Sequence, residues 1–162
     1  MKKVVLGMLL CATIGFAQTK KSNAMKQSDS IHTETPYVPY ISVGLSFTNG
    51  DDFKKDSYPS VEIGITKGNI SFGLALGRGN LYFEQDNISN YFYEPKVTGS
   101  LPIGKLYGTL VFGIGGYIDT PHTFIEYGSG LGYTDGNISY SITYSNWDKV
   151  DYITPCITYT FN

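Results

Sequence analysis

The amino-acid sequence predicts an all-β fold in which eight antiparallel strands follow one another along the chain. Eight segments alternate apolar residues with small or polar ones, which is the period-two pattern of strands. The composition, with 19 Gly, 14 Tyr and 9 Phe in 162 residues, favours strands joined by tight connections. Two nearly identical hexapeptides, TKGNIS at 66–71 and TDGNIS at 134–139, each separate two such segments, as hairpin turns do.

A secretory leader is expected at the N-terminus. Residues 1–17 combine Lys2 and Lys3 with an apolar stretch and small residues near its end, which is typical of a signal peptide. The apolar stretch is too short for a membrane-spanning helix. Residues 18–36 are polar and non-periodic and predict a flexible periplasmic tail. A single domain would then occupy 37–162.

Charge and cysteine content argue against several classes of function. The chain carries 12 Lys+Arg and 14 Asp+Glu, and without a basic patch we expect no nucleic-acid partner. Cleavage of the leader would leave Cys156 as the one cysteine, so neither an intrachain disulfide nor a cysteine-based metal site is expected. The runs GSGLG and GIGG lack the spacing of a dinucleotide-binding loop, and we expect no cofactor.

The predicted strands each place apolar side chains on one face and small or polar ones on the other. They are 40–48, 59–66, 70–77, 91–101, 106–118, 124–133, 138–147 and 152–162. Pro95 and Pro155 lie inside two of them, and each removes a backbone donor. We therefore expect a bulge or another local irregularity at both prolines.

The connections between strands alternate in character. Two-residue loops at 67–68, 103–104 and 135–136 would pair Ile65 with Ile70, Leu101 with Leu106 and Tyr133 with Ile138, apolar against apolar. The remaining connections, NGDDFKKDS, RGNLYFEQDNIS, DTPH and DKVD, are longer or more polar. Tight turns would thus lie at one end of an up-and-down meander and longer loops at the other.

The charged residues indicate which face is inside. A soluble barrel needs a surface of which roughly 25–35% is charged. Here the strand interiors carry only Glu62, Glu94, Lys96 and Glu126, all on the face opposite the apolar one. We therefore predict a transmembrane β-barrel whose lumen holds these four as a polar network.

Aromatic residues fall into two predicted sets. Tyr107 and Tyr117 share the inner face, where neighbouring glycines would leave them room. A second set near the strand ends would form interfacial girdles. This set contains Tyr133, Tyr144, Trp147, Tyr152, Tyr159 and Phe161.

The chain resembles the small outer-membrane β-barrels of the OmpA/OmpX type over residues 37–162. The resemblance rests on the leader, the eight strands, the alternation of turns and loops, and the closing strand ITPCITYTFN. It implies a monomer in the outer membrane, with membrane lipid and the barrel-assembly machinery as partners. Ile157, Tyr159 and Phe161 would form the assembly signal, although Asn162 follows the last aromatic. The FAQ ending of the leader resembles leaders of Bacteroidota.

Three functions remain open from the sequence. The first is a non-enzymatic outer-membrane barrel that supports the envelope or presents surface loops, with Phe53, Tyr82 and Phe83 as loop contacts. The second is a lipid-modifying outer-membrane enzyme, and the third is a soluble lipocalin-like ligand-binding barrel. His122, Glu126 and Ser129 do not make a catalytic triad, because strand parity points Glu126 inward and Ser129 outward. We expect no catalytic residues.

Overall fold

The computed structural model describes residues 35–49, 57–83, 86–118, 120–147 and 150–161. The predicted signal peptide and residues 18–34 of the predicted tail lie outside the described residues. No helix in the described part of the chain is long and apolar enough to cross a membrane.

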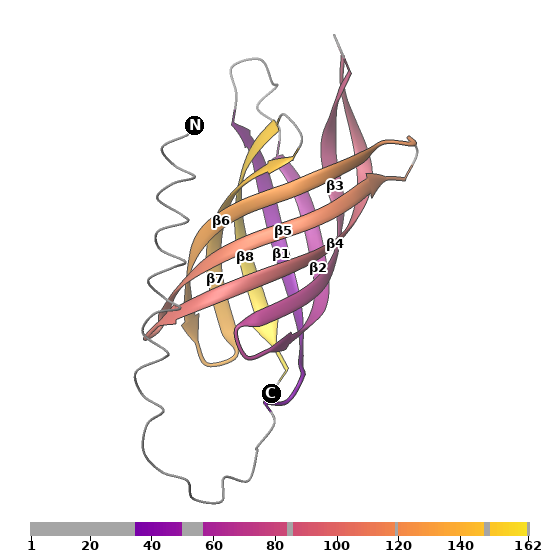
Figure 1. Cartoon of the computed structure of the whole chain (residues 1–162). Helices are drawn as coiled ribbons and strands as arrows, with labels where there is room; N and C mark the ends of the chain where they lie inside the picture. The colour runs from indigo at the N-terminus through magenta and orange to yellow at the C-terminus, as the bar shows by residue number, and fades with distance from the viewer. Residues whose placement is uncertain (1–34, 50–56, 84–85, 119, 148–149, 162) are drawn as a thin grey trace, which may run out of the picture. The chain divides into compact units, whose positions relative to one another are not determined.

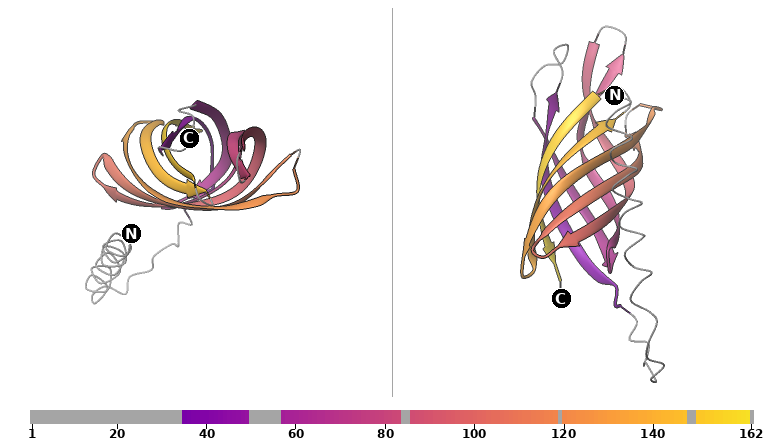
Figure 2. Two further views of the ribbon diagram at one scale, coloured as in Figure 1. Left: turned by 90° about the horizontal axis from the view of Figure 1, so that it is seen from above. Right: turned by 60° about the vertical axis from the view of Figure 1, so that its left-hand side comes forward.

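Eight strands form a closed barrel in which each pairs antiparallel with the next and β1 pairs with β8 (Figure 1). The strands are β1 Val38–Asn49, β2 Ser57–Lys67, β3 Ile70–Phe83, β4 Asp86–Ile103, β5 Leu106–Tyr117, β6 Thr123–Asp135, β7 Ile138–Trp147 and β8 Val150–Thr160. They are tilted across the barrel wall (Figure 2). The predicted up-and-down barrel is confirmed.

Three tight turns join β2 to β3, β4 to β5 and β6 to β7, but their positions differ from the prediction. The turn residues are 68–69, 104–105 and 136–137, and the closing pairs are Lys67↔Ile70, Ile103↔Leu106 and Asp135↔Ile138. Each turn therefore starts with a glycine of positive φ, between 60° and 68°, as the primed hairpin turns require. The predicted registers are wrong by two residues.

The connection between β3 and β4 was predicted as a long loop and is instead a continued hairpin. The two strands remain paired as far as Phe83↔Asp86. In the described residues β3 pairs with β2 only up to Gly77, so the distal part of this hairpin continues beyond that pairing (Figure 1). The predicted loop residues Tyr82 and Phe83 thus belong to a strand, whereas Phe53 lies outside the described residues.

Pro95 and Pro155 interrupt ladders without shifting them. Pro95 pairs with Leu74 of β3, but the β4–β5 ladder has a gap between Tyr93↔Gly116 and Lys96↔Gly113. The β1–β8 ladder has a matching gap around Pro155. The register is the same on both sides of each gap, so the expected irregularity is present but no bulge is inserted.

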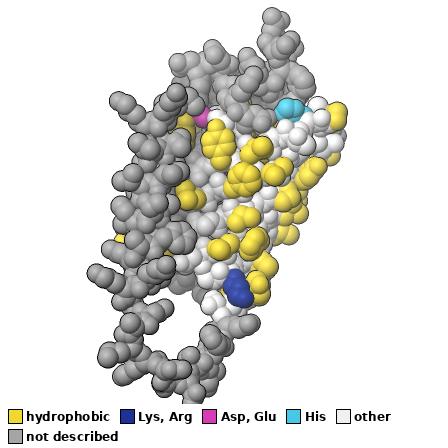
Figure 3. Space-filling view, viewed as in Figure 1, with side chains coloured by type: hydrophobic (Ala, Val, Ile, Leu, Met, Phe, Trp, Pro, Cys, Tyr) yellow, Lys and Arg dark blue, Asp and Glu magenta, His cyan; other side chains and the backbone are white. Residues whose placement is uncertain are grey.

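The barrel wall has an apolar outside. Side chains on the outward positions of all eight strands are exposed, among them Ile41, Val61, Phe72, Val97, Phe112, Tyr127, Ile142 and Ile157. Figure 3 shows such side chains spread over the face that includes β5 and β6. Leu74 is 39% exposed and Phe112 52%, whereas Glu126 is 4% exposed. The predicted orientation of the two strand faces is confirmed.

Candidate functional site: the barrel interior

The interior changes character along the barrel. Hydroxyl-bearing side chains surround an open cavity at the end with the tight turns, which we call the vestibule. Charged side chains lie at mid-height and form the charged layer. Aromatic rings fill the opposite end and form the aromatic plug. All three zones come from the inward positions of strands whose outward positions are apolar, because successive side chains of a strand point to opposite faces.

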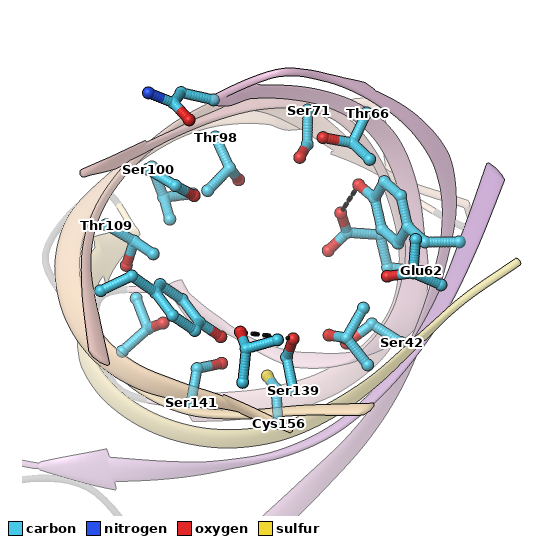
Figure 4. Close-up of a pocket in the computed structure, with 18 of the residues that line it drawn as sticks. Ser42, Glu62, Thr66, Ser71, Thr98, Ser100, Thr109, Ser139, Ser141 and Cys156 are labelled. Atoms are coloured by element: carbon cyan, nitrogen blue, oxygen red, sulfur yellow. Dashed lines mark hydrogen bonds between the residues drawn. The ribbon is translucent and has the colours of Figure 1, made fainter. Parts of the chain in front are cut away.

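The vestibule is a cavity of about 330 Å³ whose lining includes the turn residues Gly68 and Asn69. Ser and Thr hydroxyls dominate its wall (Figure 4). The hydroxyls bond to one another, with Thr158 Oγ1 donating to Ser42 Oγ at 2.8 Å, or to backbone, with Ser42 Oγ donating to the carbonyl of Ile157 at 3.3 Å. Such a surface is wettable but carries little charge.

Tyr107, predicted to point inward, lines the vestibule. Its ring lies against Gly132 of β6, where an added Cβ would be 2.1 Å from the ring. Cys156 also lines this cavity and lies below Ser139 in Figure 4. The glycine on the neighbouring strand is thus what makes room for an aromatic ring within a narrow lumen.

The charged layer contains the four ionisable residues that the sequence singled out. Lys96 Nζ forms an ion pair with Glu62 Oε2 at 2.9 Å. The hydroxyl of Tyr40 donates to the other oxygen of Glu62. Glu94 and Glu126 are more deeply buried, at 0% and 4% exposed. The layer therefore holds three carboxyl groups around one ammonium group.

The aromatic plug lies at the end where Tyr117, Phe124 and Trp147 begin or end their strands. The Trp147 ring stacks on Phe124 at 5.0 Å between ring centres and meets Phe92 edge-on at 4.7 Å. Tyr152 packs on Trp147 at 4.5 Å. These rings join Tyr58, Ala75 and Val150 in one buried cluster, the hydrophobic core of the molecule.

For two residues of the predicted girdle the prediction is therefore wrong, because they lie inside the barrel. Trp147 and Tyr152 were expected on the outer surface, but they are 6% and 0% exposed and belong to the plug. Strand parity gives the reason, since the outward neighbours Tyr144 and Ile153 lie an odd number of positions away. The same parity would have placed Phe92 and Phe124 inside. Alternation, and not nearness to a strand end, decides which face a strand residue occupies.

The remaining predicted residues occupy separate places. Tyr117 belongs to the plug. Ile157, Tyr159 and Phe161 face outward, and the rings of Tyr159 and Phe161 are in edge-to-face contact at 5.0 Å. The side chains of Tyr82 and Phe83 lie outside the described set.

The candidate hydrolytic residues are not brought together. Glu126 is buried inside the barrel, whereas Ser129 is paired between Leu110 and Tyr144, whose side chains are exposed. The ring of His122 lies near Tyr117, at 6.2 Å between ring centres. Among the described residues, no cluster of His, Cys, Asp and Glu side chains is arranged to hold a metal ion.

Comparisons with known proteins bear on the fold. No protein-family model and no curated protein sequence matches the chain. The N-terminal β-barrel domain of Pseudomonas aeruginosa OprF is similar in structure, with a TM-score of 0.55 and 12% identity, over 75% of this chain and 97% of that domain. Neisserial surface protein A (NspA) matches with a TM-score of 0.47 and 12% identity, over 77% of this chain and 97% of that one. The likeness to the OprF domain confirms the fold that the sequence predicted, that of the small eight-stranded outer-membrane barrels.

Proposed function

We propose that the chain is an integral outer-membrane barrel without enzymatic activity, which supports the envelope and presents its loop end to the surroundings. The observation that carries the proposal is the belt of exposed Ile, Leu, Val, Phe and Tyr side chains on all eight strands. The largest apolar patch on a soluble monomer is about 300–600 Å². A belt around the whole barrel calls for a hydrocarbon environment instead.

The closed topology fits the same environment. Each strand is paired on both sides, with β1 joined to β8, so the wall has no free edge. A membrane interior offers no water to unpaired backbone groups, and closure satisfies them. The strands contain between 10 and 18 residues. About 9–11 tilted residues suffice to cross a bilayer.

A filled lumen argues against a role as a steady pore. An eight-stranded barrel is just wide enough for side chains to fill its interior. Here Phe92, Phe124 and Trp147 fill the end opposite the vestibule. We therefore assign function to the outside of the barrel and to the loop end, where the β3–β4 hairpin with Tyr82 and Phe83 supplies a contact surface.

Membrane fractionation tests the proposed location. Cells that express the full chain should retain it in the outer-membrane pellet after a carbonate wash. Unheated and boiled samples should migrate differently on a gel, since a closed barrel resists detergent until it is heated. Recovery of the folded protein in a detergent-free soluble fraction would contradict the proposal.

Analysis of lipid A tests the proposal that the protein is not a lipid-modifying enzyme. Mass spectrometry of lipid A from a deletion strain and its parent should give the same species. A modification that disappears with the deletion, and returns with the wild-type gene, would identify an enzyme instead.

We infer that the outward residues of β8, together with Phe161 directly after it, serve assembly. Ile157, Tyr159 and Phe161 form an exposed apolar row at the end of the chain. Truncating Phe161 to alanine should lower the amount of protein in the outer membrane, whereas Phe112→Ala, at an equally exposed site on β5, should leave it unchanged. Equal amounts of both variants would remove this role.

A further inference from the structure

Glu94 and Glu126 lie on either side of strand β5, which has a glycine at the position between them. Glu94 lies on β4 and Glu126 on β6, and Gly113 of the intervening β5 pairs directly with Glu126. The Glu94 carboxyl group lies over this glycine, with Oε1 2.0 Å from the position that a Cβ would take. The two carboxyl groups are thereby brought within interaction range of each other.

Three oxygens of this pair have no hydrogen-bond partner. They are both oxygens of Glu94 and Oε2 of Glu126, and each exposes less than 1 Å² of surface. A cavity of about 40 Å³ adjoins the charged layer, but oxygens so deeply buried are out of reach of water inside it. Leaving buried carboxylates without donors is costly, so another source of compensation is required.

The surrounding groups cannot neutralise both carboxylates. Lys96, on the same strand as Glu94, is the one cation that lines this cavity, and its ammonium group pairs with Glu62 of β2 at 2.9 Å. Tyr40 of β1 donates to Glu62. Trp147 and Ser145 of β7 and Cys156 of β8 also face the pair, and the first two place donor groups beside Glu126. If every carboxyl group were ionised, the layer would hold three negative charges against one positive charge.

We propose that Glu94 and Glu126 form a proton-binding site in which one proton is shared between the two carboxyl groups. Ionised carboxylates are acceptors only, so their oxygens can hydrogen-bond to each other only when one of them carries a proton. One proton removes a buried charge and supplies a donor between the two carboxyl groups. Two carboxyl groups that share a site behave in this way elsewhere.

The shared proton makes folding depend on pH in a defined direction. In an unfolded chain glutamate loses its proton near pH 4.3, so at neutral pH the folded state binds one proton more than the unfolded state. Above about pH 4.3, the stability that this site contributes falls as the pH rises. While the pair keeps its proton, the equilibrium constant for folding falls about tenfold per pH unit because of this site.

Infrared spectroscopy of the folded protein tests the site directly. The full chain, purified from membranes into an alkyl maltoside that has no carbonyl group, should show the C=O stretch of a protonated carboxylic acid at neutral pH. Glu94→Gln and Glu126→Gln should each abolish this band, and Asp135→Asn, which changes an exposed carboxyl group paired with Lys105 at a tight turn, should retain it. Absence of the band from the wild type, or its persistence in both pair variants, would overturn the proposal.

Stability against pH supplies the second measurement. In Glu94→Gln or Glu126→Gln, the side-chain amide can donate a hydrogen bond to the remaining carboxylate, which then needs no bound proton. At least one of the two variants should therefore fold. Fluorescence of Trp147, the single tryptophan, follows unfolding in urea. Relative to the wild type, that variant should lose a tenfold-per-unit pH dependence of its equilibrium constant for folding, whereas Asp135→Asn should keep it. Failure of both variants to fold, or an unchanged pH dependence, would contradict a shared proton.

Discussion

Single residues explain how a narrow lumen accommodates large side chains. Tyr107 lies over Gly132, and Glu94 lies over Gly113. In both cases the large side chain and the glycine are on neighbouring strands, so the absence of a Cβ on one strand gives space to the other. Glycine in these strands is therefore a packing requirement as well as a source of flexibility.

Gly113→Ala tests this packing. The new methyl group would lie 2.0 Å from Glu94 Oε1, so Glu94 or the strand must move. Overpacking of this kind costs about 1–3 kcal/mol in the free energy of unfolding. Gly108→Ala is the matched control on the same strand, because an added Cβ meets no atom within 4 Å there. Urea unfolding of both variants gives the comparison, and equal stabilities would contradict the packing role of Gly113.

Alternation alone was enough to place most residues on the correct face. It put Glu62, Glu94, Lys96 and Glu126 on the inner wall, since a strand offers only two faces. It could not reveal that Glu94 lies over Gly113, because that contact depends on how adjacent strands are staggered. Trp147 and Tyr152, predicted on the outside from their position near strand ends, lie inside as their parity requires.

At the level of elements, the turns fix the stagger between neighbouring strands. Each begins with a glycine of positive φ: Gly68, Gly104 and Gly136. The sequence pattern predicted glycine at the second turn position, as in Asp-Gly turns. The predicted registers of these three hairpins therefore differ from the observed ones by two residues. A shift of two keeps each side chain on its face, and the hydrophobic pattern therefore could not detect the error.

Gly136→Ala tests the turn between β6 and β7. A residue with a Cβ in the left-handed region is strained, and the cost is about 1–2 kcal/mol. Gly99→Ala serves as the control, because that site is open and its φ is not positive. Unfolding in urea should show a loss for Gly136→Ala alone. A Gly136→Ala barrel as stable as the control would mean that this turn does not hold the register.

The long β3–β4 hairpin was hidden from sequence reasoning for a different reason. The segment RGNLYFEQDNIS contains Gly, Asn and charged residues, which are typical of loops. In the structure cross-strand pairing such as Leu81↔Ile88 continues through it. Pairing with a neighbouring strand is non-local, and local composition does not encode it.

At the level of the whole molecule, the interior has one wet end and one dry end. The vestibule is about 330 Å³ and polar, whereas the plug is a packed cluster of aromatic rings. The charged layer lies between them. A barrel built in this way in a membrane would separate the solutions on its two sides.

Trp147→Ala should breach that separation. The ring contacts Phe92, Phe124 and Tyr152, so its removal leaves a gap at the centre of the plug. In planar lipid bilayers the wild type should be silent and Trp147→Ala should conduct, with Phe92→Ala as a second plug variant. Phe112→Ala, on the outer wall, is the control and should remain silent. A wild type that conducts steadily, or plug variants as silent as the control, would show that the aromatic rings are not the barrier.

The central claim is that the apolar face of every strand contacts lipid, and nitroxide scanning along β3 tests it most directly. With Cys156 replaced by serine, single labels are placed from Ile70 to Leu76 in the protein reconstituted into bilayers. Collision rates with oxygen should be high at Ile70, Phe72, Leu74 and Leu76, which are exposed, and low at the inward positions between them. Oxygen collision rates without this alternation, or with the inward positions higher, would contradict the account.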